Sequence, residues 1–474
     1  MTTQQVTGLT GETRSLDADT LASFGRDLDG ELARPGDEGY TEATSIWNGM
    51  ITRRPSVVVR AASTDDVVRT VTFARDNELE LSVRGGGHNI AGLCLTDGGL
   101  MLDLSPLRTV RVDPDTKLAR VAGGATLGDV DRATQEHGLA ATLGFVSLTG
   151  VAGLTLGGGF GYLTRQFGWT VDDLEEVEIV GADGTVRRAS RSENEDLFWA
   201  LRGGGGNFGV VTEFVYRLHQ VGPQITGGLM AWPADRAKEV LDTYRQVTES
   251  APRELTLVAV RRNAPPAPWV PAELHGTPIV LIVACHTGSP EAAEADLAPL
   301  RALGNPIADL VAVKDYTVHQ TLLDATMPKG NHYYWKSEFV PKLSDELLET
   351  YHAQFVDMKA PANQITLFHL AGALNERPED DGAVGNRDAG YACVCQAMWT
   401  PDSPAADANK EWVRSAWSAL KRFSTGGNYV NFQTDDETDD RTAESYRGNL
   451  DRLREAKAKY DPTNLFRVNR NIRA

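Results

Sequence analysis

The stretch Arg84-Gly85-Gly86-Gly87-His88-Asn89 follows Glu78–Val83, a run in which polar and apolar residues alternate as in a β-strand. Three consecutive glycines allow the backbone to approach a bulky ligand because no Cβ stands in the way. Their N–H groups can converge on phosphate oxygens, and Arg84 adds positive charge. His88 then places an imidazole beside such a ligand. Taken alone, the motif favours a strand-to-loop turn with a surface histidine over a ligand site.

Three further segments give this motif its context. They are the glycine cluster Gly150–Gly161, the cluster Arg202–Gly209 and the closing stretch Tyr460–Ile472, which reads YDPTNLFRVNRNI. In this order the four segments resemble the vanillyl-alcohol oxidase superfamily, and most closely its berberine bridge enzyme-like and D-specific hydroxynicotine oxidase-like branch. The resemblance is strong over residues 45–220 and 425–474 and loose between them. Tight backbone packing without a ligand remains an alternative for the cluster Arg202–Gly209.

The resemblance implies an α+β fold with a two-part FAD-binding domain of the PCMH type. Residues 1–222 and 435–474 would form this discontinuous domain. Residues 223–434 would form a substrate-binding domain with a large antiparallel sheet backed by helices, ending in a berberine bridge enzyme-like segment.

Hydrophobic periodicity agrees with this division. In the first region the strands Ser56–Ala62 and Glu78–Val83 flank a helix, Asp65–Asn77, which Thr64 is expected to cap. Longer strand patterns follow at Ile225–Trp232, Leu255–Arg261, Pro278–Cys285, Tyr333–Val340, Ile365–Leu370 and Ala389–Met398. A single helix is predicted over Glu444–Lys459, and the acidic run 435–440 is predicted to be a solvated loop.

Composition excludes several classes of function. The formal net charge of −18 would repel nucleic acid and anionic membranes, so neither is expected as a partner. No apolar run approaches the ~20 residues that span a bilayer, and Met1–Arg14 has no apolar core, which favours the cytoplasm. The histidines and cysteines lack zinc-site spacing, so no metal is expected. The oligomeric state stays open.

FAD is the cofactor that the resemblance implies, with His88 bonded to the flavin. Many relatives add a cysteinyl link at the position that is Val146 here, so a single covalent link is expected. The resemblance assigns the cofactor contacts to Arg84, Gly85, Gly86, Gly87, His88, Asn89, Thr149, Gly150, Gly153, Leu154, Thr155, Gly158, Gly159, Phe160, Gly209, Val211, Asn469 and Asn471.

The catalytic candidates are Tyr429, Asn431 and His369. Tyr429 is the leading base, although a tyrosine with an ordinary pKa near ~10 needs a neighbouring cation or donor. Relatives assist it with a second tyrosine where this chain has Phe160. A pocket-lining or core role for Tyr429 remains the alternative. Lys336 and Glu338 lie on one strand face and are predicted to form a structural ion pair.

The expected activity is that of an oxidase acting on an alcohol, sugar or amine carbon, with transfer of hydride to flavin N5. O2 would accept the electrons and give H2O2, because Thr149 has the valine-like size that accompanies oxidases in the family. A dehydrogenase with another electron acceptor and a flavin-binding protein without turnover are the alternatives. The substrate is a small molecule whose identity the sequence does not define.

Overall fold

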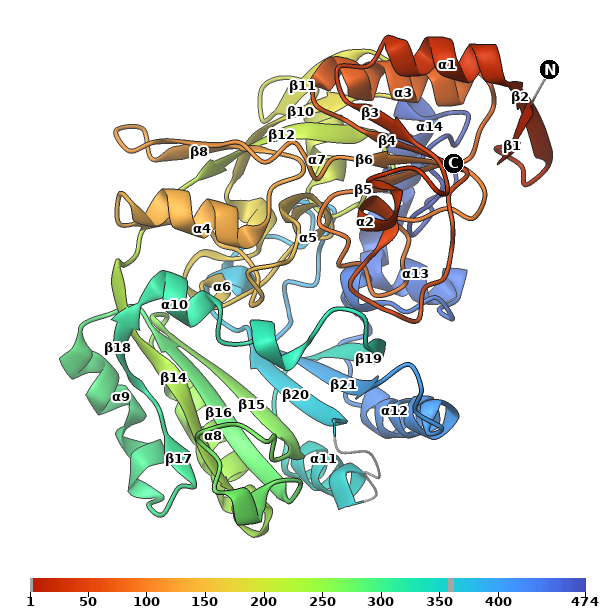
Figure 1. The fold of residues 1–474 in the computed structure, drawn as a ribbon. Helices are drawn as coiled ribbons and strands as arrows, with labels where there is room; N and C mark the ends of the chain where they lie inside the picture. The colour runs from red at the N-terminus through yellow and green to blue at the C-terminus, as the bar shows by residue number, and fades with distance from the viewer. Residues whose placement is uncertain (1–2, 357–361) are drawn as a thin grey trace.

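The computed structural model describes residues 3–356 and 362–474, and it has the α+β fold that was predicted. Figure 1 shows two halves. The upper half contains the N-terminal strands and helices together with the C-terminal helices, and the lower half contains one large sheet with its helices. The cofactor and active-site residues predicted above come from both halves.

A four-stranded sheet carries the first glycine loop. Its order is β3 (Glu31–Ala33), β4 (Val57–Arg60), β6 (Leu100–Asp103) and β5 (Leu81–Arg84), and β6 pairs in parallel with both of its neighbours. Helix α3 (Thr64–Asp76) connects β4 to β5 and buries Val67 and Val71. The helix cap is Ser63 and not Thr64, because the Ser63 side chain accepts from the Asp66 N–H. Strand β5 ends at Arg84 and so delivers the chain to Gly85.

A five-stranded antiparallel sheet carries the other two glycine clusters. Its order is β11 (Val186–Ser190), β10 (Leu174–Val180), β12 (Val210–Arg217), β8 (Leu118–Ala122) and β7 (Val110–Asp113). Its apolar side chains share one core with α4 (Leu127–Gln135), α5 (Val151–Leu156) and α7 (Glu195–Leu201). The remaining elements of the upper half are β1 (Thr3–Thr7), β2 (Thr13–Asp17), α1 (Ala18–Arg26), α2 (Tyr40–Thr44), α6 (Thr164–Phe167), β9 (Leu139–Ala140) and β13 (His219–Gln220).

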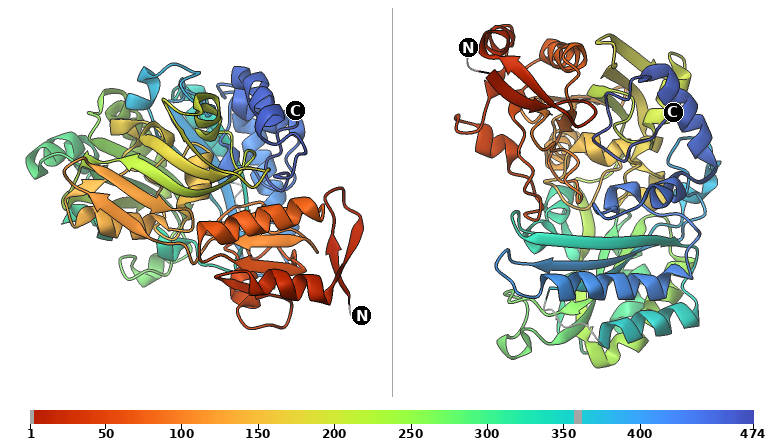
Figure 2. Two further views of the ribbon diagram at one scale, coloured as in Figure 1. Left: turned by 90° about the horizontal axis from the view of Figure 1, so that it is seen from above. Right: turned by 90° about the vertical axis from the view of Figure 1, so that its right-hand side faces the viewer.

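The lower half is an eight-stranded antiparallel sheet. Its order is β17 (Ala308–Asp309), β14 (Gln224–Pro233), β16 (Pro278–His286), β15 (Leu255–Asn263), β20 (Gln364–His369), β21 (Tyr391–Trp399) and β19 (His332–Val340), and β18 (Ala312–Asp315) also pairs with β14. Four helices pack on one face: α8 (Ala237–Ser250), α9 (Pro290–Ala302), α11 (Asp345–Val356) and α12 (Ala406–Lys421). The opposite face packs against the upper half, where its core includes Trp47, Phe160 and Trp169. Strand β19 forms one edge, with α12 alongside it (Figure 2).

The chain then returns to the upper half through α13 (Asp439–Tyr446) and α14 (Leu450–Tyr460). The single helix predicted over Glu444–Lys459 is wrong, because the backbone breaks at Arg447, whose φ is +48°. Leu453 on α14 packs in the same core as α7. The last residues therefore lie beside the N-terminal glycine loops, although they are far from them in sequence.

Candidate cofactor pocket and active site

One large pocket lies where the two halves meet. The glycine loops after β5 and before α5 line it from the upper half, and Asn469 and Arg470 line it from the C-terminal segment. The eight-stranded sheet contributes Trp335, Phe368 and Gln396. The structure therefore brings the four segments that suggested the family to one place.

Glycine is needed in these loops for two different physical reasons. A Cβ on Gly86 would lie 2.5 Å from the Gly150 Cα, so these two backbones are in direct contact. A Cβ on Gly153 or Gly206 would meet no atom within 4 Å, and both residues line the pocket. Gly86 and Gly150 therefore hold the two loops together, whereas Gly153 and Gly206 leave the pocket wall flat for a ligand.

His88 faces this pocket as a neutral imidazole. Its ring stacks on Trp47, with ring centroids 5.3 Å apart and planes 13° apart. Burial, and then the positive charge of Lys329, lower the pKa of His88 to about 4. At neutral pH the ring is therefore uncharged, and one of its two nitrogens has a free lone pair that can act as a nucleophile.

Most predicted cofactor residues lie in the pocket wall. Those that line it are Gly85, Gly86, Gly87, His88, Asn89, Thr149, Gly150, Gly153, Leu154, Phe160, Gly209, Val211 and Asn469. Val146, at the position where the resemblance implied a cysteinyl link in relatives, also lines it.

Five predicted cofactor residues lie outside the lining, and four of them make other contacts. The Arg84 guanidinium is 3.2 Å from the Asp103 carboxylate, and the Thr155 hydroxyl is 2.6 Å from that of Tyr216. Gly158 and Gly159 form a turn with positive φ that packs on Val384 and Thr170. Asn471 is half-buried, and its side-chain Oδ1 is buried without a partner among the described residues. The placement of these five residues outside the lining is a correction, whereas the positive charge that Arg84 would supply to the ligand remains a prediction.

His369 is also a correction, because it does not line the pocket. Alternation along β20 places it with Ile365 and Leu367, whose side chains pack towards α8 and α11. Its ring stacks on Tyr391, whose hydroxyl lies 2.7 Å from that of Thr248 on α8. Burial holds the pKa of His369 well below its usual range. A catalytic role for His369 does not fit this placement.

Aromatic side chains line the pocket, two of them (Trp335 and Phe368) from the opposite face of the sheet and the others from segments outside it. Six of them touch in sequence, with ring centroids of successive neighbours 4.8–5.6 Å apart, and are called the aromatic wall below: Phe145, Phe368, Phe160, Tyr429, Phe432 and Trp335. Sequence reasoning missed Phe145, Trp335, Phe368 and Phe432, and also Trp47 and Gln396. Their patterns are those of ordinary core residues, so nothing local marks them as pocket residues.

Tyr429 and Asn431 lie together in the pocket. The Asn431 amide donates to the Tyr429 hydroxyl at 3.0 Å and to the carbonyl oxygens of Gly153 and Leu154 at 3.1 and 3.2 Å. Burial raises the pKa of Tyr429 well above its usual range, against the opposing hydrogen bond from Asn431. Within the described residues no cation contacts the phenol, so it stays protonated at neutral pH.

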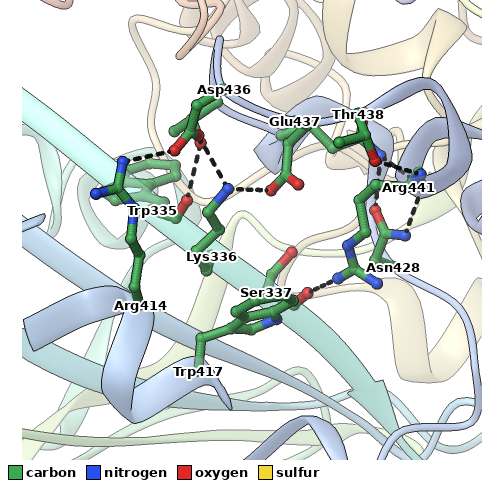
Figure 3. A network of polar contacts seen from close by, with 12 residues as sticks. Trp335, Lys336, Ser337, Arg414, Trp417, Asn428, Asp436, Glu437, Thr438 and Arg441 are labelled. Atoms are coloured by element: carbon green, nitrogen blue, oxygen red, sulfur yellow. Dashed lines mark hydrogen bonds and ion pairs between the residues drawn. The ribbon is translucent and has the colours of Figure 1, made fainter. Parts of the chain in front are cut away.

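A polar network at the edge of the sheet anchors the segment that follows Tyr429 and Phe432 (Figure 3). On β19, Trp335 faces the pocket and Lys336 faces α12. The Lys336 ammonium donates to Asp436 at 2.9 Å and to Glu437 at 2.7 Å, and Arg414 of α12 also donates to Asp436. Segment 428–441 therefore passes around the edge strand, from the pocket face to the helix face.

The ion pair predicted between Lys336 and Glu338 is wrong. Glu338 instead pairs with Arg441 at 2.5 Å, and Lys336 pairs with the acidic run. The acidic run was predicted to be solvated, and Asp435, Asp436 and Thr438–Asp440 are exposed. Glu437 is the exception, since its side chain is only 8% exposed. The Lys336 ammonium explains why this carboxylate leaves water.

The loop 144–149 closes another side of the pocket. Ser147 donates its N–H and its hydroxyl to the Asp324 carboxylate, at 2.9 and 2.5 Å. This contact joins the two halves and fixes Val146 and Thr149 at the wall. Leu323 and Met327, on either side of Asp324, line the pocket as well.

The residues of this pocket fit FAD. Flat glycine surfaces at Gly153 and Gly206 match a ligand that lies close to the backbone. Three lining side chains have a buried polar atom without a partner in the described part of the chain: the Tyr446 hydroxyl, Asn469 Oδ1 and Arg470 Nε. A ligand rich in hydrogen-bonding atoms would satisfy such groups.

Two other searches gave negative results. Across residues 3–356 and 362–474, no cluster of three His, Cys, Asp or Glu side chains is arranged to hold a metal ion. In the same residues, no helix is both long enough and apolar enough to cross a membrane.

Comparison with known proteins identifies the family. Residues 55–190 match the FAD binding domain, and residues 428–473 match the family described as berberine and berberine like. The (R)-6-hydroxynicotine oxidase of Paenarthrobacter nicotinovorans is 31% identical over 453 residues, which cover 94% of this chain and 97% of that protein. Glucooligosaccharide oxidase of Sarocladium strictum is 29% identical over 477 residues, covering 92% and 91%.

A solved structure agrees with the sequence comparison. The crystal structure of 6-hydroxy-D-nicotine oxidase from Arthrobacter nicotinovorans matches with a TM-score of 0.82 at 28% identity, covering 94% of this chain and 98% of that one. The relatives are named FAD-linked oxidoreductases and oxidases. Since fold, pocket and sequence agree over nearly the whole length, the chain is an FAD-linked oxidoreductase and belongs to the berberine bridge enzyme-like family of the vanillyl-alcohol oxidase superfamily.

Proposed function

We propose that the protein is an oxidase with FAD bonded to His88 alone, which oxidises an alcohol, sugar or amine carbon and reduces O2 to H2O2. The observation that carries the proposal is the position of His88, a neutral imidazole in the wall of the pocket that also contains Thr149, Tyr429 and Asn431. Val146 has no sulfur for a second link. When bound, FAD would accept two electrons from the substrate and pass them to O2.

The chain's own residues would position the cofactor and the substrate. The flat glycine surfaces would take the cofactor, and Asn469 and Arg470 would supply polar contacts from the C-terminal segment. Asn431 would fix Tyr429 as a hydroxyl donor above the pocket. We also propose residues 1–222 and 435–474 as the FAD-binding domain and residues 223–434 as the substrate domain, with the pocket between them.

A flavin-binding protein without turnover is the second candidate. Phe160 lacks the hydroxyl found in many relatives, and Tyr429 lies among aromatic rings with its pKa raised. Screening alcohols, sugars and amines for anaerobic bleaching of the flavin separates the two candidates. Bleaching by at least one class supports the oxidase, and its absence for all classes supports the binding protein.

The covalent link has a direct test. Acid precipitation of the denatured holoprotein should leave the yellow colour in the pellet, and the pellet of His88→Ala should be colourless. Mass spectrometry of a peptic digest should find the flavin on the peptide that contains His88 and on no other. Release of all colour into the supernatant by the wild-type protein would refute the bond.

A further inference from the structure

The side of the pocket that the proposed function leaves for the substrate is almost entirely aromatic and aliphatic. The aromatic wall provides six rings from β19, β20, the segment 428–434 and the loops at Phe145 and Phe160. Leu323 and Met327 close the same space from the segment before β19. Such a surface binds flat apolar groups, because aromatic rings favour edge-to-face and offset-stacked contacts.

Charge is missing from this side. In the part of the chain that the structure describes, the pocket lining contains no aspartate, glutamate or lysine. Arg470, its one permanent cation, donates to the Gln433 and Thr434 carbonyl oxygens at 2.6 and 2.5 Å. A charged substrate group would therefore lose its water without gaining an ion-pair partner, which disfavours its binding.

Polar groups on this side are also few. Tyr429 and Asn431 are already bonded to each other. Gln396, on β21, has its side-chain oxygen engaged by the Gln364 amide, and its own amide nitrogen has no protein partner among the described residues. The Gln396 amide and the Tyr429 O–H, which stays free because Asn431 donates to the hydroxyl oxygen, therefore remain as donors to polar substrate atoms. A sugar chain would bury many hydroxyl groups against aromatic rings with too few partners.

Resting on the proposed function, we infer that this site takes a substrate built on an uncharged aromatic ring, and that it excludes carboxylates and oligosaccharides. The ring packs against the aromatic wall, and the Gln396 amide donates to one polar atom at the edge of the ring. This separates the protein from its oligosaccharide-oxidising relatives, although they share its fold.

Equilibrium binding to the holoprotein tests the inference without relying on turnover. Four probes form matched sets: 2-naphthol, its saturated counterpart decahydro-2-naphthol, the anion 2-naphthoate, and xylobiose. Binding is followed under anaerobic conditions by tryptophan fluorescence and by the flavin absorption spectrum.

We expect 2-naphthol to bind about 2- to 10-fold more tightly than its saturated counterpart. We expect 2-naphthoate to bind at least ~10-fold more weakly than 2-naphthol, and xylobiose not to bind. Xylobiose or 2-naphthoate binding as tightly as 2-naphthol would overturn the inference.

Gln396→Leu tests the predicted donor. The variant should bind 2-naphthol about 2- to 10-fold more weakly than the wild-type protein, which is the effect of one lost hydrogen bond. Its affinity for naphthalene should not change, because naphthalene has no polar atom. Equal weakening of both ligands would show that Gln396 only shapes the wall. If the variant does not fold, the wild-type probe series decides alone.

The two hypotheses fail in different ways. Reduction of the flavin by xylobiose would keep the proposed oxidase and overturn the aromatic substrate class. Tight binding of 2-naphthol without flavin reduction by any substrate would keep the aromatic site and overturn the oxidase.

Discussion

Gly86 and Gly150 pack backbone to backbone, so that a Cβ on Gly150 would lie 2.7 Å from the Gly86 Cα. The two residues lie in different loops, since Gly86 follows β5 of the four-stranded sheet and Gly150 precedes α5, which shares a core with the five-stranded sheet. Their contact joins these two loops at the pocket. Glycine is therefore required here by the fold itself, before any cofactor is bound.

Glycine-to-alanine substitutions should separate folding from cofactor loading. Gly86→Ala forces two backbones apart and should lower Tm or prevent soluble expression. Gly153→Ala meets no protein atom, so the apoprotein should keep its Tm while FAD loading falls. Thermal melts and the ratio of flavin to protein absorbance measure the two effects. Full FAD loading of Gly153→Ala would contradict the placement of the cofactor at this surface.

Thr149 controls access of O2 in the proposed mechanism. Thr149→Leu should slow reoxidation of the reduced flavin at least ~10-fold, because the larger side chain blocks the approach of O2, and anaerobic reduction by substrate should change little. Stopped-flow absorbance measures both half-reactions. Thr149→Val preserves the size and is the matched control. If the wild-type protein itself reoxidises over many minutes, the dehydrogenase alternative is correct.

Tyr429 should act as a protonated phenol. Since burial raises its pKa above the ordinary value near ~10, it should contribute no inflection to the pH profile of kcat/KM between about pH 6 and 9. Tyr429→Phe should keep the profile shape and lose less than ~10-fold in kcat/KM. A loss of 10²-fold or more together with a vanished inflection is the result expected of a general base.

Lys336 stabilises the segment that carries Tyr429. Lys336→Met leaves Glu437 buried and unpaired, which should cost about 3 kcal/mol and lower Tm. Hydrogen bonds from Tyr334, Arg414 and Lys336 outweigh burial and hold the pKa of Asp436 below its usual range. A carboxyl group whose pKa is lowered by folding stabilises the fold at pH values above its pKa in the unfolded state. The loss of unfolding free energy in Lys336→Met should therefore shrink as pH falls below about 4.

Lys421 supplies the control for this experiment. It lies on the surface of α12, 43% exposed and 3.7 Å from Glu444. Lys421→Met should change stability by less than ~1 kcal/mol. Equal effects of the two substitutions would show that the network around Lys336 contributes no more than a surface ion pair.

Asp131 is a buried carboxyl that costs stability at high pH. Burial raises its pKa to about 7, although the Gln320 amide donates to it at 3.0 Å. A raised pKa means that stability is lost as pH rises from about 4 to about 7, and the cost then stays constant. Asp131→Asn should therefore stabilise the protein by roughly 2 kcal/mol more at pH 8 than at pH 5. Melts of Asp115→Asn, at an exposed position, should show no such difference.

Sequence patterns were enough to predict the strands and the glycine loops that meet at the pocket. Alternation correctly grouped His369 with Ile365 and Leu367, but which face they occupy depends on where α8 and α11 pack, and no local signal gives this. Lys336 and Glu338 were correctly placed on one face of β19. Their partners, Asp436, Glu437 and Arg441, lie about a hundred residues away, beyond the reach of periodicity.

The C-terminal segment also has a consequence for biosynthesis. His88 is made early, whereas Asn469 and Arg470, which line the same pocket, are added much later. Because synthesis runs from the N-terminus, a nascent chain exposes the histidine before its binding cavity exists. We therefore expect flavin loading to follow translation of residue 470, and bound yellow colour to mark the molecules in which that last segment has docked.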